Sequence, residues 1–202
     1  NNYQVDLVKL QNFVNPIQFF SIWLHPKYYR NPFIETIKAI DYFYEEIKKN
    51  DSVIGYAGSI KDIEKNMSKN KISAFLTIEG GEALEGEIEV LRALYKLGVR
   101  SMTLTWNYQN QIGHGVMENG IEEGLTDFGM EVIQEMNILG MIIDVSHLSE
   151  SGFWDIKRIV SKPFIASHSN ARTICNHPRN LSDSQLKAIA EVDGVVGINA
   201  YP

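Results

Sequence analysis

Two histidines follow hydrophobic runs in the same way. His147 ends the run MIIDVSH and His168 ends the run PFIASH. We interpret both runs as buried strands, so that the two histidines occupy the last positions of consecutive strands. If these strands are parallel neighbours, their backbones lie about 4.8 Å apart, and both imidazoles can reach one metal ion at the Zn–N distance of about 2.0 to 2.1 Å. The spacing therefore permits a shared metal site.

A glutamate is the third candidate ligand. Glu79 ends ISAFLTIE, another run of strand length, and its longer side chain can lean across to the same ion. A lone histidine at a strand end is more often a hydrogen-bonded rim residue than a ligand. From spacing alone, that alternative stays open for all three positions.

Six apolar runs of strand length would have to position these side chains. The runs are continuously apolar rather than alternating, which is typical of strands that are covered on both faces in a parallel sheet. They span residues 17–24, 72–79, 101–106, 141–147, 163–168 and 195–201.

Segments with helical periodicity lie between the runs. Thr126 and Ser182 each precede apolar residues at three-four spacing, so both are predicted N-caps. Gly98, Gly140 and Gly194 each follow a periodic segment and precede the next strand. We expect these three glycines to be left-handed C-caps.

The alternation of strand and helix predicts an α/β fold with right-handed crossovers. A doubly wound sheet and a (β/α)8 TIM barrel both fit this alternation. The barrel is favoured because Glu79, Trp106, His147 and His168 lie at the C-terminal ends of successive strands, where barrel enzymes build their active sites. Residues 1–202 then form a single domain with about six of the eight strands, which makes it an incomplete barrel.

Composition excludes several classes of protein. The formal charge of −6 and the pI near 5.4 argue against nonspecific nucleic-acid binding, which needs a concentrated basic surface. No window has eighteen consecutive apolar residues, so we expect no membrane segment. The single Cys175 excludes a multi-cysteine zinc site and suits a reducing, cytoplasmic compartment. The edges of an open six-strand segment are natural sites of association, which makes a homo-oligomer compatible with the sequence.

A glycine-rich stretch, GHGVMENG, superficially suggests a phosphate-binding loop. Glu118 stands where the third glycine of GxGxxG belongs, and no strand runs directly into the stretch. We therefore expect residues 113–120 to be a flexible loop, with His114 solvated rather than part of a lid.

Four longer motifs stand out in the chain: IEGGEAL, VLRALYKLGVRSMTLTWN, GLTDFGMEVIQEMNILGMIIDVSHLS and ASHSNARTICNHPRNLSDSQL. Taken together, they resemble the membrane dipeptidase (renal dipeptidase) family of zinc peptidases, and in particular its bacterial members. The resemblance extends from about Val5 to the end of the chain and implies a (β/α)8 metallohydrolase with two zinc ions that hydrolyses dipeptides through a metal-bridging hydroxide.

The resemblance also implies roles for individual residues. Glu79 matches the catalytic glutamate that bridges both zinc ions, and His147 with His168 matches the histidine pair of the second zinc. Arg179 matches an arginine that binds the carboxylate of the substrate. Trp106 stands where the renal enzymes carry a histidine that contacts substrate, so we expect Trp106 to be a substrate-binding residue, although substrate preference cannot be copied from those enzymes. We expect an outer-shell acceptor to fix the histidine tautomers, with Asp144 as the candidate.

Two parts of the family pattern do not occur in this sequence. The first zinc of the family is held by a His-x-Asp pair, which is found nowhere in the chain, and an aspartate of the last strand is also missing. We therefore expect a fragment of a longer enzyme that is inactive alone. Two alternatives stay open: a metal-dependent amidohydrolase acting on another small amide or a lactone, and a non-catalytic barrel scaffold.

Overall fold

The strands of this protein form one parallel sheet that curves into a half-barrel. The computed structural model describes residues 4–118, 123–160 and 162–200. Within these ranges six strands follow one another in the order β1-β3-β4-β5-β6-β7, and β2 pairs with the beginning of β3. The strands are β1 (Ile17–Trp23), β2 (Ile54–Tyr56), β3 (Ile72–Glu79), β4 (Ser101–Thr103), β5 (Ile142–Asp144), β6 (Ile165–Ala166) and β7 (Val195–Val196).

Six strands on one continuous path confirm the predicted partial (β/α)8 barrel. All six runs contribute a strand, although the last run extends to Tyr201, which lies outside the described residues. Hydrophobic periodicity did not predict β2, because its three residues IGY are too few for a periodic signal.

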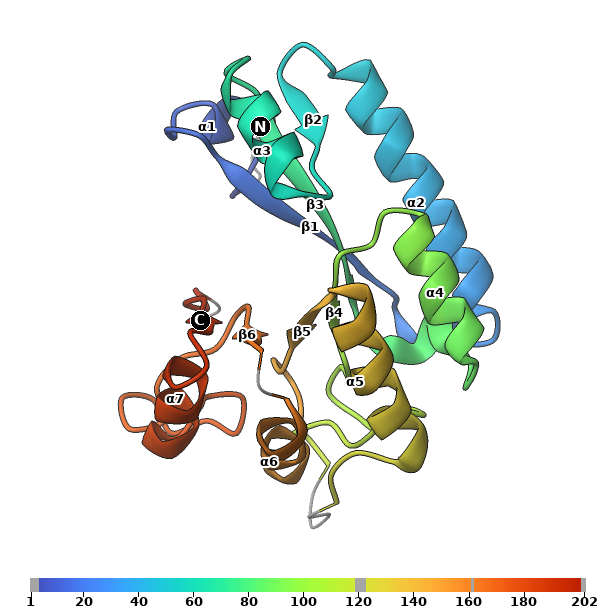
Figure 1. Cartoon of the computed structure of the whole chain (residues 1–202), viewed down its shortest axis with the longest axis vertical. Helices are drawn as coiled ribbons and strands as arrows, with labels where there is room; N and C mark the ends of the chain where they lie inside the picture. The colour runs from blue at the N-terminus through green and yellow to red at the C-terminus, as the bar shows by residue number, and fades with distance from the viewer. Residues whose placement is uncertain (1–3, 119–122, 161, 201–202) are drawn as a thin grey trace.

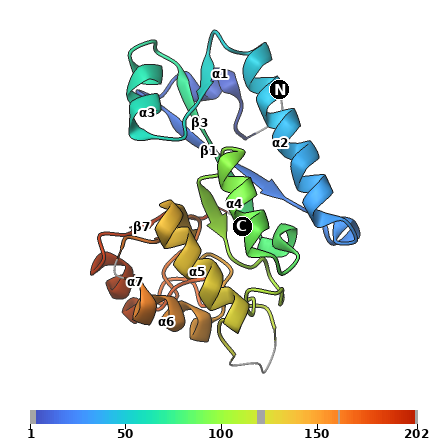
Figure 2. The same ribbon diagram turned by 45° about the vertical axis from the view of Figure 1, so that its right-hand side comes forward.

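The larger helices follow one another along the outer side of the sheet, as Figures 1 and 2 show. None of the helices in the described ranges has both the length and the apolar character that crossing a bilayer requires. The α-helices are α1 (Leu7–Leu10), α2 (Pro32–Lys49), α3 (Ile60–Met67), α4 (Ile88–Lys96), α5 (Asp127–Leu139), α6 (Glu150–Ile159) and α7 (Asp183–Ala190), and two short 3-10 helices are η1 (Pro26–Tyr28) and η2 (Gly81–Leu84).

Local sequence signals set most of the helix ends. The Thr126 hydroxyl accepts a hydrogen bond from the Gly129 amide at 2.9 Å, and Ser182 forms a capping box at the start of α7. Gly98 and Gly140 are left-handed, with φ of 101° and 72°, as predicted.

The third predicted glycine cap is wrong. At the end of α7 the left-handed residue is Asp193, with φ of 54°, and Gly194 does not have a positive φ. A Cβ at Gly194 would lie 2.3 Å from the Phe164 carbonyl oxygen. Glycine is needed there because two backbones approach closely, not because the helix ends.

Three strands end earlier than their apolar runs predict. β4, β5 and β6 stop at Thr103, Asp144 and Ala166, so Trp106, His147 and His168 lie in the loops that follow rather than on the last strand positions. His147 has a left-handed φ of 69°, which extended strand backbone cannot adopt. Only Glu79 is the final residue of its strand, as expected.

The two faces of the half-barrel differ in polarity. Side chains that face the helices, such as Leu76 and Met102, are fully buried in one hydrophobic cluster. The concave face bounds a cavity of about 410 Å³. It carries Ser21, Thr77, Ser101, Thr103 and Asp144 between the apolar residues Ile17, Phe19 and Val195. Among the described strands, β1 pairs only with β3 and β7 only with β6, which leaves one edge of each unpaired.

The helix-facing side should dominate stability. Leu94→Ala in α4 removes a fully buried side chain and should lower the free energy of unfolding by about 2 to 5 kcal/mol. Leu97→Ala, at the 40% exposed position after the same helix, should change it by no more than about 0.5 kcal/mol. Urea denaturation of both variants measures the difference, and equal midpoints would contradict the assigned core.

Candidate metal centre

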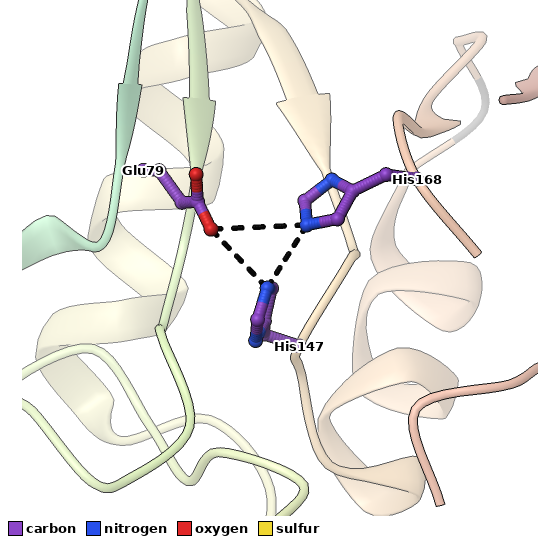
Figure 3. Close-up of side chains that lie close together, drawn as sticks. All are labelled: Glu79, His147 and His168. Carbon is purple, nitrogen blue, oxygen red and sulfur yellow. Dashed lines mark hydrogen bonds and ion pairs between the residues drawn. The ribbon is translucent and has the colours of Figure 1, made fainter. Parts of the chain in front are cut away.

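Glu79, His147 and His168 converge at the C-terminal ends of the strands. The Glu79 Oε1 atom lies 3.2 Å from His147 Nε2 and 3.7 Å from His168 Nε2, and the two Nε2 atoms are 2.9 Å apart. Figure 3 shows the three side chains pointing toward one another from β3, from the loop after β5 and from the loop after β6. The structure therefore brings together the three residues that the sequence selects as ligands.

The spacing of these three atoms suits one zinc ion. Four ligands arranged tetrahedrally at about 2.0 to 2.1 Å from zinc are separated from one another by about 3.3 Å. The observed separations of 2.9, 3.2 and 3.7 Å scatter on either side of that value. Three protein ligands with the fourth position open is also the usual composition of a catalytic zinc site.

Hydrogen bonds on the far side of each ring select its tautomer. The Nδ1 atom of His147 lies 2.8 Å from the Asn107 side-chain oxygen, and Nδ1 of His168 lies 2.8 Å from the Ser167 hydroxyl. When each Nδ1 donates a proton to these oxygens, both Nε2 atoms direct lone pairs at the Glu79 carboxylate and at each other. Such an arrangement is unfavourable unless a cation, either a proton or a metal ion, lies between them.

The charge states of the ligands suit metal binding. Burial by itself raises the pKa of the Glu79 carboxyl, but the hydrogen bond and charge of His147 and the charge of His168 outweigh it and hold the pKa below its ordinary value. Burial, together with the charges of Arg179 and His168, lowers the pKa of His147, and these effects outweigh the hydrogen bond and the charge of Glu79, which raise it. An ionised carboxylate and a neutral imidazole are the forms that ligate zinc.

Arg179 lies beside this cluster. Its Nη2 atom donates to the backbone carbonyl of His168 at 3.2 Å, and no other hydrogen bond from its guanidinium reaches a residue within the described ranges. Burial lowers the pKa of Arg179 although the charges of Asp144 and Glu79 raise it, and a guanidinium stays charged in proteins. The predicted carboxylate-binding residue therefore offers a cation with unused donors next to the candidate ligands.

Aromatic rings form one wall of the site. The Trp106 ring centre is 6.4 Å from that of His147 and 5.2 Å from that of Trp23 on β1. The Tyr108 ring meets Trp106 edge-on, with ring centres 6.1 Å apart. Trp106, predicted as a substrate contact, therefore lies at the site.

Sequence reasoning missed Asn107 and Ser167. Asn107 directly follows Trp106, and a polar amide at the end of an apolar run was an available signal. Ser167 belongs to a Ser-His pair that repeats at Ser146-His147. The repetition was visible, but which hydroxyl contacts which ring depends on the fold.

His114 contradicts the prediction of a solvated loop. Its side chain is buried, with Nδ1 2.7 Å from a Glu118 carboxylate oxygen and Nε2 3.1 Å from a Glu123 oxygen. Backbone bridges from Gly113 and Gly115 tie the stretch to neighbouring segments. Residues 119 and 120 of the glycine-rich stretch lie outside the described residues.

Glu79, His147 and His168 are the only group of three or more His, Cys, Asp or Glu side chains in ranges 4–118, 123–160 and 162–200 that is placed to hold a metal ion. The described residues thus contain candidate ligands for one metal ion.

Comparisons with known proteins show that the chain is similar to members of one protein family. The sequence profile of the membrane dipeptidases, peptidase family M19, matches residues 1–202. The uncharacterised protein in the pqqA 5′ region of Klebsiella pneumoniae is 42% identical over 70% of this chain and 54% of its own length. An uncharacterised dipeptidase of Schizosaccharomyces pombe is 33% identical over 97% of this chain and 50% of its own.

A solved structure supports the same grouping. The crystal structure of the dipeptidase AC, a metallopeptidase of family M19, has a TM-score of 0.88 and 26% identity, and the match covers 96% of this chain and 62% of that one. The present chain thus spans about half the length of the curated relatives that it matches.

Zinc binding tests the cluster directly. After removal of metal with a chelator, the 202-residue chain should bind one zinc ion weakly, and His168→Ala should lower that affinity by at least about a further 10-fold, because it removes a ligand. The matched control is His25→Ala, which removes an exposed imidazole next to η1 and should leave the affinity unchanged. Isothermal titration calorimetry of the three proteins measures this, and equal affinities would remove His168 from the site.

Proposed function

The chain belongs to the membrane dipeptidase family, peptidase family M19, and on that premise we propose that its protein is a zinc-dependent dipeptidase. The observation that carries this proposal is the convergence of Glu79, His147 and His168, with ligand atoms 2.9 to 3.7 Å apart. These are the positions that match the family's zinc ligands.

The residues of this chain would act mainly by holding the zinc ion and by orienting the substrate. Glu79 would give an ionised carboxylate, and His147 and His168 would each give a neutral Nε2. Zinc, when bound, supplies a Lewis acid that lowers the pKa of water and polarises a carbonyl group. In the two-zinc site of the family, the Glu79 carboxylate would also help to hold the second zinc ion, whose His-x-Asp ligands do not occur in this sequence.

The 202 residues would therefore hold part of a two-zinc site. The sequence contains no His-x-Asp pair, and the concave face of the half-barrel is open along the β1 and β7 edges. We expect this chain by itself to bind zinc weakly and to lack dipeptidase activity.

Arg179 and Trp106 would bind the substrate. A guanidinium presents a planar fork of donors that matches both oxygens of a carboxylate, so Arg179 suits the free C-terminal carboxylate of a dipeptide. The rings of Trp106 and Trp23 would contact an apolar side chain of the same substrate. Together these contacts would favour short peptides over long ones.

Activity of the polypeptide encoded by the complete open reading frame tests the proposal. With zinc it should hydrolyse members of a dipeptide panel. Glu79→Gln should reduce turnover by more than about 100-fold, because loss of even an outer-shell partner costs about 10 to 100-fold. Glu87→Gln, at an exposed position before α4, is the matched control and should retain full activity.

Two other outcomes would replace the proposal. Hydrolysis of lactones or cyclic amides with no turnover of any dipeptide would indicate another amidohydrolase. Zinc content and phenotype that are both unchanged by Glu79→Gln would indicate a non-catalytic scaffold.

Arg179 gives a sharper test of the substrate class. Arg179→Gln should raise KM for dipeptides by about 10 to 100-fold, because a hydrogen bond to a charged group contributes about 1.5 to 3 kcal/mol. The same variant should change KM little for dipeptide amides, which lack the carboxylate. Steady-state kinetics on matched acid and amide substrates decide this, and an equal rise for both would refute a carboxylate contact.

A further inference from the structure

We propose that Asp144 and Ser167 form a hydrogen-bonded relay that fixes the tautomer of His168 and so presents its Nε2 lone pair to the metal. Both would be positioning residues, because they would act on the ion only through the His168 ring. The inference deepens the proposed function and rests on it for the identity of the ion.

Asp144 is the fixed end of the relay. It is 3% exposed, and its Oδ1 atom accepts hydrogen bonds from the backbone amides of Ser146 at 3.0 Å and Ser167 at 2.9 Å. Its Oδ2 atom accepts from the Thr103 hydroxyl at 2.7 Å and from the Ser167 hydroxyl. With four donors around it, the carboxylate acts as an acceptor only.

The Ser167 hydroxyl connects the Asp144 carboxylate to the His168 imidazole. A serine hydroxyl has one proton, and Ser167 donates it to Asp144. The 2.8 Å contact between Ser167 Oγ and His168 Nδ1 then requires the ring to be the donor. His168 is thereby held with its proton on Nδ1 and its lone pair on Nε2, which faces Glu79.

A further contact fixes the backbone of the same ligand. The His168 amide donates to the Ser146 hydroxyl at 3.2 Å. The two repeated serines therefore have different tasks: Ser146 holds the main chain of His168, and Ser167 orients its ring.

The two histidine ligands differ in what lies behind them. His147 Nδ1 meets the neutral amide of Asn107, whereas His168 Nδ1 is connected through one hydroxyl to a buried carboxylate. A carboxylate behind a ligating histidine fixes its tautomer and raises its basicity as a ligand. His168 should therefore bind the metal ion more strongly than His147 does.

The experiment compares Ser167→Ala with two matched variants of the 202-residue chain. Ser167→Thr keeps the hydroxyl and should restore the relay. Ser169→Ala removes a buried hydroxyl two residues away that has no hydrogen-bond partner among the described residues. It therefore controls for the loss of a serine oxygen in the same loop.

Two readouts are needed. Nitrogen-15 NMR of the metal-free protein, with neutral imidazoles, should show His168 protonated at Nδ1 in the unmutated, Ser167→Thr and Ser169→Ala proteins, and a mixture of tautomers in Ser167→Ala. Competition with a chromophoric chelator should show zinc affinity about 10 to 100-fold weaker in Ser167→Ala only.

The outcomes separate this inference from the proposed function. An unchanged His168 tautomer in Ser167→Ala would overturn the relay, even if the protein proves to be a dipeptidase. A shifted tautomer in a protein whose unmutated form takes up no zinc would support the relay and count against the zinc site. Equal loss of affinity in Ser167→Ala and Ser169→Ala would also overturn the relay, because it would indicate a general loosening of the loop.

Discussion

The register of four neighbouring parallel strands is the constraint on which the metal centre depends. Glu79 pairs with Thr103, Thr103 with Asp144, and Asp144 with Ile165 in one row across β3, β4, β5 and β6. This row brings the carboxyl ends of the strands to the same level. The loops that carry His147 and His168 therefore begin beside Glu79, and a shift of one residue would turn each side chain in the row to the other face.

The same strand register separates polar from apolar side chains on the two faces of the sheet. Residues on the helix side are apolar and fully buried, whereas Thr103 and Asp144 on the concave side hydrogen-bond to each other at 2.7 Å. A buried carboxylate is costly unless donors surround it, and Asp144 has four. The fold thus carries a satisfied polar network beside the candidate ligands, whose two Nε2 atoms lie 2.9 Å apart.

The chain belongs to the membrane dipeptidase family. It spans about half the length of the curated relatives that it matches. The described residues contain one compact set of three candidate ligands, flanked by Arg179 and an aromatic wall. The unpaired edges of β1 and β7 border the same concave face. The candidate ligands Glu79 and His168 and the edge strands β1 and β7 therefore border one concave surface.

Local signals in the sequence were sufficient for six of the seven described strands, for the caps at Thr126 and Ser182, and for Glu79 as the last residue of its strand. These features depend on neighbours within a few residues. Contacts between distant segments decided the rest: His147 meets Asn107 across 40 residues, and Asp144 meets Ser167 across 23. They also decided that His114 is buried and that three strands end early. Hydrophobic periodicity records which residues are buried, but it carries no information about which polar atoms meet when separate loops fold onto the same end of a sheet.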